Sequence, residues 1–258
     1  MKKLGKIYLA LVLFFLYVPI FVLIVFSFNE SKSRSVFSGF TLDWYRKLFQ
    51  NDIIISSLVN TIIIAVLASI ISTVLGTLAA IGINGMRKVP KAVVMNITNM
   101  PIINPEIVTG VSLMLLFVFF AARMNLEFGF VTLLIAHITF DVPYVILNIM
   151  PKFRQMDPHL YEAAQDLGCN PLSAFIKVVL PEIMPGVVSG FLMAFTYSLD
   201  DFVISYFTSG SSSQTLPVTI YSMTRRKVSP EINALSTIIF GVVVIILIVK
   251  NVIELRQM

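Results

Sequence analysis

The segment between the fourth and fifth apolar runs of this chain reads PKFRQMDPHLYEAAQDLGCNPLSAFIKVVLPEIMP, residues 151–185. It is a polar island between stretches that are mostly apolar. Pro and Gly residues divide it, and a Glu-Ala-Ala triplet at 162–164 stands near its middle. These features predict a helical loop that lies outside the apolar phase and is held by another molecule in water.

The composition places the rest of the chain in a lipid bilayer. Of its 258 residues, 57% are hydrophobic and 13% are charged, and the mean hydropathy is +0.89. A bilayer crossing requires about 20 apolar residues, and we expect six spans near 7–28, 57–83, 102–122, 128–150, 186–208 and 234–254. The sequence therefore predicts an all-α membrane protein with six transmembrane helices.

The first apolar run is expected to be a permanent span. It is longer than the apolar core of a secretory signal and lacks a small-x-small cleavage site before Asn29. Cys169 is the single cysteine, which excludes an internal disulfide framework and a thiolate metal cluster.

The distribution of positive charge predicts the orientation. An even number of spans places both termini on one side, and cytoplasmic flanks carry an excess of Lys and Arg. Placing the termini inside leaves more than half of the 19 Lys and Arg residues in the cytoplasm. The cluster Arg225-Arg226-Lys227 argues for the reverse, but the Lys-rich first span usually dominates. We expect cytoplasmic termini, a cytoplasmic polar island and no nucleic-acid partner, since no basic block is interleaved with aromatic residues.

The first half of the polar island has the signals of a short amphipathic helix. Asp157 can cap it, with Pro158 at the first helical position. Leu160, Ala164 and Leu167 then recur on one face. A small surface helix of this kind occurs in many membrane proteins, so these signals alone assign no function.

The second half begins with a break. Gly168 suits the left-handed residue that ends a helix, and Asn170-Pro171 restarts one by the same capping rules. We expect Leu180-Pro181 to end this second helix.

The full spacing of the island resembles the shared cytoplasmic loop of bacterial ABC importer permeases. That loop reads Glu-Ala-Ala, three residues, Gly, nine residues, Ile, one residue, Leu-Pro. The matching positions here are Glu162, Ala163, Ala164, Gly168, Leu180 and Pro181, with Val178 at the position of the Ile. The resemblance implies a type I importer fold (MetI-like), in which this loop is a coupling helix seated on a separate ATPase with Glu162 facing an arginine. The sequence has no phosphate-binding loop of its own, so ATP and Mg²⁺ are expected on the ATPase partner, with no cofactor or metal on this chain.

The fifth predicted span carries adjacent carboxylates. A charged residue at a helix centre costs roughly 2.5–3.5 kcal/mol, yet Asp200 and Asp201 follow Ser198 there, and spans three to five contain no Lys or Arg. His137 is the one ionisable candidate partner, and we interpret it as a packing residue. The two acidic residues are therefore expected to lack a partner in this chain.

A continuous helix would align this polar group along one side. The positions Ser198, Asp201, Ser205 and Thr208 would form a stripe, with Tyr197 and Asp200 beside it. Such a stripe faces a cavity or a neighbouring protein rather than lipid.

Glu106 adds a carboxylate behind Pro101 and Pro105, where a broken helix could open toward a pathway. Asp141 is the weakest candidate, consistent with local packing. An acidic lining favours a cation, although the sequence leaves open which carboxyls are ionised and which lie in outer water.

The stretch around these carboxylates gives a second, more specific resemblance. Its segments are SLDDFVIS at 198–205, LPV at 216–218, IYSM at 220–223 and VSPEINA at 228–234. They look like the second permease subunit of spermidine/putrescine importers. The resemblance implies a polyamine cargo, a sister permease, an ATPase dimer and an extracytoplasmic binding protein at a bacterial inner membrane. It associates Trp44, Glu106, Ser198 and Asp200 with uptake, and Trp44 could equally be an anchor at the membrane interface.

The predicted organisation has an N-terminal span with its outer loop at 1–56, a permease domain at 57–250 and a tail at 251–258. An importer of another solute shares the Glu-Ala-Ala loop and stays possible, although carboxylates in the path argue against an anion. An ion-coupled secondary cation carrier is the alternative from another class, although no inverted repeat is apparent. An intramembrane enzyme ranks last, because two isolated His and one Cys form no recognisable catalytic motif.

Overall fold

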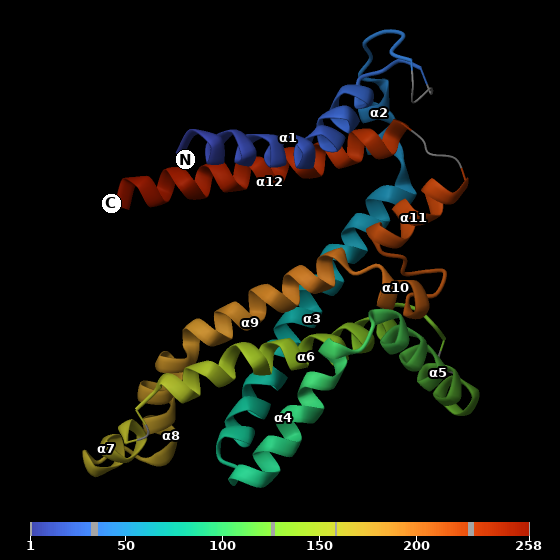
Figure 1. The fold of residues 1–258 in the computed structure, drawn as a ribbon. Helices are drawn as coiled ribbons and strands as arrows, with labels where there is room; N and C mark the ends of the chain where they lie inside the picture. Colours follow the sequence, from blue (N-terminus) through green and yellow to red (C-terminus); the bar gives the residue numbers. More distant parts are fainter. Residues whose placement is uncertain (1, 32–35, 125–126, 158, 227–229, 258) are drawn as a thin grey trace. The chain divides into compact units, whose positions relative to one another are not determined.

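The computed structural model is helical over the residues that it describes, which are 2–31, 36–124, 127–157, 159–226 and 230–257 (Figure 1). Within these ranges there is no strand, and an isolated bridge joins Asn29 to Phe40. The chain forms two compact units. The first contains Met1–Ile55 and Thr219–Met258, and the second contains Ser56–Val218.

The predicted all-α membrane fold is confirmed. Among the described residues, five helices are long and apolar enough to cross a bilayer. They are α1 (Lys2–Ser27), α3 (Asp52–Asn84), α5 (Glu106–Met124), α6 (Phe130–Gln155) and the run Pro171–Asp200, which ends in α9 (Leu180–Asp200). The sixth expected span lies in α12 (Pro230–Gln257), with a shorter described apolar stretch at Pro230–Ile245.

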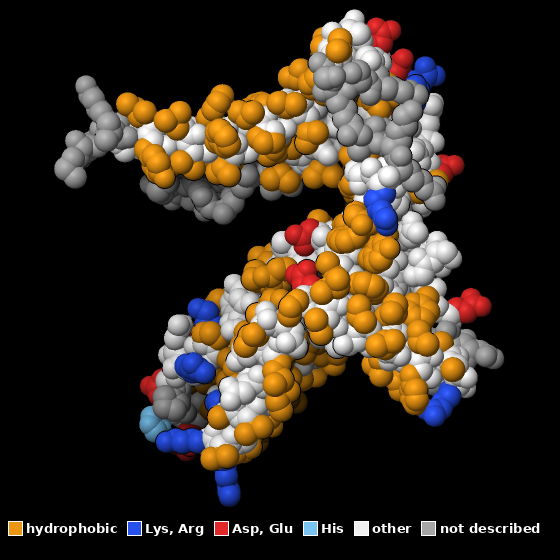
Figure 2. All heavy atoms as spheres, turned by 45° about the vertical axis from the view of Figure 1, so that its right-hand side comes forward, with side chains coloured by type: hydrophobic (Ala, Val, Ile, Leu, Met, Phe, Trp, Pro, Cys, Tyr) orange, Lys and Arg blue, Asp and Glu red, His pale blue; other side chains and the backbone are white. Residues whose placement is uncertain are grey.

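The apolar side chains of these helices are largely on the outside. Figure 2 shows hydrophobic side chains over much of the visible surface of the helices, and Phe15 and Ile103 are 84% and 80% exposed. A soluble protein rarely exposes so much contiguous apolar surface. The exposed faces are therefore suited to contact lipid or other membrane helices.

In the first unit, α1 and α2 (Asp43–Gln50) pack against α12. Among the described residues between α1 and α2, the Asn29 side chain accepts from the Ser38 N–H at 2.9 Å and donates to the Val36 carbonyl at 2.8 Å. Trp44 donates its indole N–H to the Asn29 carbonyl at 2.7 Å. These bonds join Asn29 to the described residues that precede α2 and to α2 itself.

In the second unit, α6 and α9 form the main packed pair. Small residues recur every four positions on α9, at Gly186, Gly190, Ala194 and Ser198, and all four are buried. A Cβ atom on Gly186 would stand 2.9 Å from the Asn148 carbonyl oxygen of α6. This ridge lets the two backbones approach closely, as small-xxx-small motifs do in membranes.

The predicted organisation into 1–56, 57–250 and 251–258 stays a prediction, and the contacts within the chain group its residues in another way. A boundary was expected near residue 56, and a change of unit occurs between Ile55 and Ser56. However, Thr219–Met258 joins the N-terminal segment rather than the predicted permease domain 57–250. The reason is that α12 packs on α1 and α2, and such a contact between distant segments leaves no local signal.

The prediction that Leu180-Pro181 ends a helix is wrong. Helix α8 (Pro171–Ala174) leads into a π-helical turn, η1 (Phe175–Val179), and then directly into α9. In η1 the Leu180 N–H bonds to the Phe175 carbonyl five residues back. The wider turn accommodates Pro181, which lacks an N–H and would crowd an ordinary α-helical turn.

Candidate functional site

The fifth predicted span is broken at its polar centre. Helix α9 ends at Asp200, Asp201 is extended (φ −60°, ψ 123°), and α10 (Val203–Thr208) follows. The Asp201 carboxylate accepts from the N–H groups of Ile204 at 3.2 Å and Ser205 at 2.7 Å. It thereby satisfies the open first turn of α10, as capping residues do. A continuous helix over 186–208 was therefore a wrong prediction, and its polar stripe is divided between two helices.

Helix α6 meets this break with a buried polar network. His137 Nδ1 lies 3.0 Å from Ser198 Oγ on α9, and Nε2 lies 3.0 Å from Ser205 Oγ on α10. The Ser198 hydroxyl donates to Asp141 Oδ2 at 2.7 Å. His137 Nε2 also lies 3.6 Å from Asp201 Oδ2. The expectation that Asp201 lacks a partner was wrong, because tertiary packing brings α6 to it.

Asp141, the weakest candidate of the sequence analysis, lies in the buried network. Its side chain is fully buried at 0% exposure. Its second oxygen, Oδ1, makes no hydrogen bond in the described part of the chain. A buried oxygen without a hydrogen bond lowers the stability of the fold by roughly 1–3 kcal/mol. Packing alone therefore does not explain why an Asp occupies this position.

A second helix break faces the same region. Helix α4 (Lys88–Ile103), which the sequence did not predict, ends before Asn104-Pro105, and α5 begins at Glu106. One turn into α5, a Cβ atom on Gly110 would stand 2.9 Å from the Phe207 ring of α10. The backbone break predicted near Pro101 and Pro105 therefore occurs at 104–105, beside α10.

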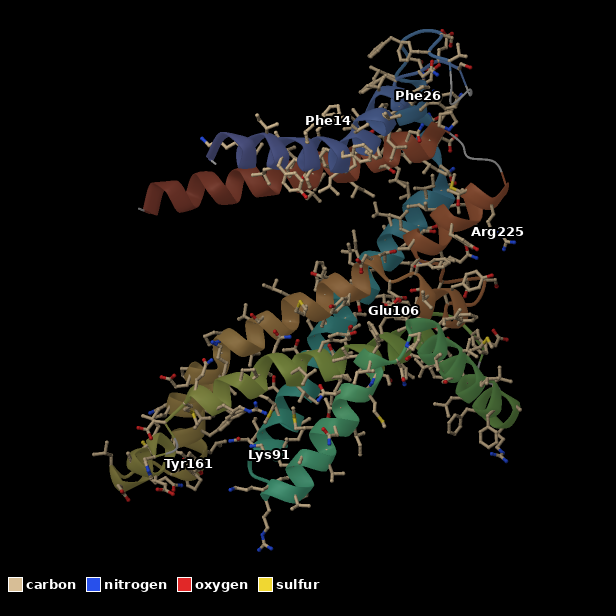
Figure 3. All side chains as sticks on the ribbon, viewed as in Figure 1. Phe14, Phe26, Lys91, Glu106, Tyr161 and Arg225 are labelled. Carbon is tan, nitrogen blue, oxygen red and sulfur yellow. The ribbon has the colours of Figure 1, made fainter. Side chains whose placement is uncertain are left out.

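Aromatic rings and carboxylates lie together here. The Tyr144 ring of α6 is 4.4 Å from the Tyr197 ring of α9, centroid to centroid. Asp141 stands three positions before Tyr144 on α6, and Asp200 stands three positions after Tyr197 on α9. Glu106 is exposed at the start of α5 (Figure 3). Ring faces attract cations, so rings beside carboxylates suit an alkylammonium group.

The predicted pathway residues differ in exposure. Asp200 is exposed at the end of α9, Tyr197 is half-buried, and Ser198 and Asp201 are buried. Glu106, Tyr197, Ser198, Asp200 and Asp201 all belong to the second unit, whereas Trp44 belongs to the first.

Trp44 is buried, and a lysine of its own helix contacts its ring. It is 5% exposed, and the Lys47 ammonium lies 4.5 Å from the ring centroid. A cation–π contact thus exists at Trp44, but its cation comes from the same helix.

The polar island forms the predicted helix, turn and helix. Gly168 has φ +90°, which is the left-handed conformation. It follows α7 (Leu160–Asp166), where Cys169 N–H bonds to the Ala164 carbonyl and Gly168 N–H to the Gln165 carbonyl. This is the Schellman pattern of helix ends, so the prediction for Gly168 is confirmed.

The capping predictions on either side of this turn are met to different degrees. The Asn170 side chain accepts from the Ser173 N–H at 2.7 Å and starts α8 as predicted. Asp157 accepts from the His159 N–H at 2.9 Å just before α7, and Pro158 lies outside the described residues. Leu167 is 88% exposed rather than part of a buried stripe, because α7 ends before it.

The Glu-Ala-Ala triplet divides between surface and core. Ala164 is buried against the loop, while Glu162 and Ala163 are exposed. Glu162 lies 3.5 Å from His159, and both side chains are mostly in solvent. The carboxylate and the small Ala163 are thus available to a partner.

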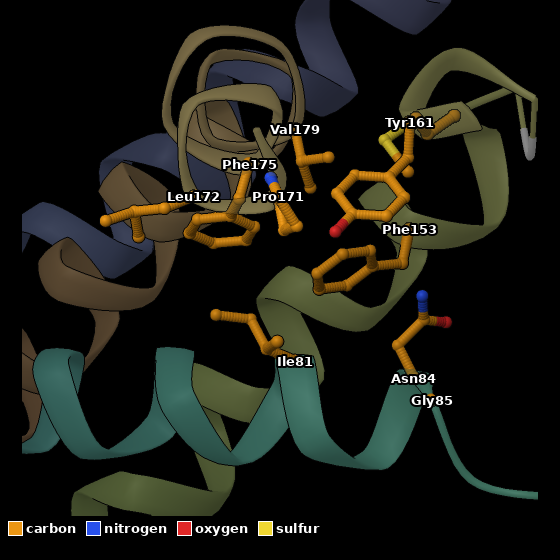
Figure 4. A pocket seen from close by; sticks show the side chains of 10 residues that line it. Ile81, Asn84, Gly85, Phe153, Tyr161, Pro171, Leu172, Phe175 and Val179 are labelled. Atoms are coloured by element: carbon orange, nitrogen blue, oxygen red, sulfur yellow. The ribbon is translucent and has the colours of Figure 1, made fainter. Parts of the chain in front are cut away.

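An apolar cavity of about 740 Å³ lies beneath this loop (Figure 4). Its walls come from the end of α3, the end of α6 and the loop itself, and include Ile81, Phe153, Tyr161 and Phe175. Lys91 of α4 bonds to Asn84 at the cavity wall, at 3.0 Å. The α3–α4 turn and the loop therefore lie at the same end of the second unit.

Sequence reasoning underestimated the α6 residues of the site. His137, Asp141 and Tyr144 follow the i, i+4, i+7 spacing that puts side chains on one helix face. That spacing in an apolar run is the signal that could have identified them. Among the described residues, no group of three or more His, Cys, Asp and Glu is suited to hold a metal ion.

Comparisons with known proteins agree with this architecture. Residues 72–255 match the family described as binding-protein-dependent transport system inner membrane component. A putrescine transport system permease protein of Escherichia coli, PotI, is 40% identical over 90% of this chain and 84% of its own. A spermidine/putrescine transport system permease protein of Haemophilus influenzae, PotC, is 38% identical over 91% of this chain and 90% of its own.

Solved structures share the fold. A chain of a bacterial ABC transporter involved in alginate import superposes with a TM-score of 0.71 at 15% identity, over 98% of this chain and 95% of that chain. A chain of an amino acid ABC transporter gives a TM-score of 0.55 at 21% identity, over 84% of this chain and all of its own.

Proposed function

Because the chain belongs to the family of binding-protein-dependent transport system inner membrane components, we propose that it is a permease subunit of an ATP-driven polyamine importer. The observation that carries the cargo is that the exposed carboxylates Glu106 and Asp200 belong to the same unit as the Tyr144–Tyr197 ring pair. Carboxylates attract ammonium groups, and ring faces accept both these groups and methylene chains. The names of the similar permeases, for putrescine and for spermidine/putrescine, support the same cargo.

The pathway is shared with a sister permease. Asp200 and Glu106 provide exposed carboxylates, Tyr197 an aromatic face, and Ser198 and Asp201 the buried support behind them. An extracytoplasmic binding protein delivers the polyamine, and Trp44 contributes to uptake from the first unit. An acidic, aromatic pathway selects a linear cation over an anion.

An ATPase dimer supplies the energy through the polar island, and ATP and Mg²⁺ bind to that dimer. Glu162 and Ala163 are exposed for contact, while Gly168 fixes the turn between the two helical segments. Leu180 and Pro181 belong to the start of α9, so the docked loop continues without interruption into the helix that ends at Asp200.

The cytoplasmic side is the end that carries the polar island. Arg87, Lys88 and Lys91 adjoin the α3–α4 turn, and Lys152 and Arg154 end α6 at the same cavity. Positive charge marks cytoplasmic flanks. Both termini are then cytoplasmic in a bacterial inner membrane.

Uptake of labelled putrescine and spermidine by proteoliposomes tests this function. The vesicles contain the chain with its sister permease, ATPase and binding protein, with ATP enclosed on the ATPase side. We expect accumulation that requires ATP hydrolysis and persists when ionophores dissipate ion gradients. Uptake that continues without ATP but stops with the ion gradient would establish a secondary carrier instead. ATP-driven uptake of another solute, with no polyamine uptake, would refute the cargo.

A further inference from the structure

We propose that His137 is a positioning residue of the transport pathway, which clamps the two helices of the broken fifth span to α6 and so holds Asp200 in place. The inference rests on the proposed function for the role of Asp200, whereas the clamp itself is a matter of geometry. Its contacts are buried and specific, since His137 is 1% exposed and Ser205 is 0% exposed.

His137 makes two buried hydrogen bonds, one at each ring nitrogen. Nδ1 lies 3.0 Å from Ser198 Oγ, and Nε2 lies 3.0 Å from Ser205 Oγ. The Ser198 hydroxyl also lies 2.7 Å from Asp141 Oδ2. A neutral imidazole has one N–H donor and one acceptor nitrogen, and a serine hydroxyl can donate or accept, so both bonds of His137 can form at once.

Each ring nitrogen consequently holds a different helix. Nδ1 binds α9 and Nε2 binds α10, while the extended Asp201 between them interrupts the helical backbone ladder. The far end of α10 is also tied to α6, because Thr132 Oγ1 donates to the Thr208 carbonyl at 2.8 Å. His137 is thus a single side chain of α6 that bonds to both sides of the break, beside the Asp141–Ser198 and Thr132–Thr208 bonds.

The position of the clamp suggests why it is needed. The helical run Pro171–Asp200 begins in the polar island and ends at the clamp, and α6 reaches the same island at its C-terminal end. The Gly186 and Gly190 ridge packs α9 closely on α6 between these two points. A displacement of the island therefore reaches Asp200 through the α6–α9 pair, and His137 makes α10 follow it.

Two amide substitutions of His137, to Asn and to Gln, distinguish the roles of its two hydrogen bonds. In His137→Asn the amide reaches the Nδ1 position and can retain the α9 bond, whereas in His137→Gln it reaches the Nε2 position and can retain the α10 bond. Ser205→Ala removes the α10 bond alone. We expect His137→Asn and Ser205→Ala to lower polyamine uptake about tenfold, the effect of losing one buried hydrogen bond, mainly through a raised KM. His137→Gln should recover most of this loss.

A distance measurement tests the clamp without reference to the cargo. Spin labels at Thr139→Cys on α6 and Ser211→Cys after α10, in a Cys169→Ser background, report how firmly α10 is held in the assembled complex. We expect one narrow distance distribution that broadens with His137→Asn and Ser205→Ala. The matched control is Thr196→Ala, an exposed threonine that bonds to its own helix at Leu192, and it should change neither readout.

Unchanged distances in both clamp variants would overturn the proposal, even if polyamine uptake falls. Broadened distances with normal uptake and KM would also overturn it, since the clamp would then be structural only. Failure of the unmodified complex to carry polyamines would refute the proposed function, while the distances would still decide whether the clamp exists.

Discussion

At the scale of single residues, two adjacent carboxylates have opposite surroundings. Both oxygens of Asp201 bond to the first turn of α10, and its side chain is buried. Asp200 is exposed at the end of α9. A ligand can therefore reach Asp200 without disturbing the fold, and substitution of Asp201 would disturb the helix break before it affected any ligand.

Asp200→Asn should reduce polyamine uptake about tenfold or more, because a charge-assisted contact contributes roughly 1.5–3 kcal/mol. The isosteric amide keeps the shape, so the complex should assemble in normal amounts. Uptake kinetics and subunit recovery after purification measure both effects. Glu127→Gln, at an exposed position outside the site, is the charge-matched control. Equal uptake by the two variants would remove Asp200 from the pathway.

Gly168→Ala should weaken the retention of the ATPase by the purified complex. A Cβ at this position meets no atom within 4 Å, so the cost comes from the backbone at φ +90°. That cost is roughly 1–2 kcal/mol for residues other than Gly, with Asn more tolerant. Gly168→Asn should therefore retain more ATPase than Gly168→Ala, and the reverse order would contradict a role for this conformation.

These residues show where sequence reasoning succeeds. The left-handed Gly168 and the Asn170 cap depend on neighbours within five residues, and both were predicted correctly. Asp201 was misjudged because its partner, His137, is distant in sequence and belongs to another helix. A pairing of this kind depends on tertiary packing, which the local pattern does not contain.

At the scale of helices, the α6–α9 pair depends on small residues. The sequence contains Gly186 and Gly190 at four-residue spacing, but this spacing does not indicate which helix packs against them. The broken helices were only partly predictable. Pro101 and Pro105 indicated the break before α5, whereas no Pro or Gly marks the break at Asp201, which a carboxylate cap makes instead.

Gly186→Ala should lower the thermal stability of the purified complex. Its Cβ would stand 2.8 Å from Lys152 Cγ and 2.9 Å from the Asn148 carbonyl oxygen, so α9 must move away from α6, at a cost of roughly 1–3 kcal/mol. Gly82→Ala in α3 is the control, since its Cβ meets nothing within 4 Å and Ala favours helix by about 0.5–1 kcal/mol. Equal melting temperatures for the two variants would show that the ridge does not limit packing.

At the scale of the whole molecule, composition was sufficient for the fold class. A mean hydropathy of +0.89 predicts that the chain forms helices in a bilayer, whatever the arrangement of those helices. The grouping of Thr219–Met258 with the N-terminal segment was not predictable. The apolar residues of α1 and α12 indicate that each helix has an apolar neighbour, but they do not indicate which helix or lipid that neighbour is. The basic residues around the polar island predict that it is cytoplasmic, and labelling of Cys169 can test this prediction.

Cys169 should react with a membrane-impermeant maleimide only after the cells are permeabilised. It follows Gly168 in the polar island and is half-buried, so reagent on the correct side can reach it. Ser211→Cys in a Cys169→Ser background is the matched control for the outer side, since Ser211 is exposed in the loop after α10. It should react in intact cells. The opposite labelling pattern would invert the topology and place the island beyond reach of a cytoplasmic ATPase. In the correct topology, assembly with the ATPase should slow Cys169 labelling in permeabilised cells, because a docked subunit covers the turn that presents it.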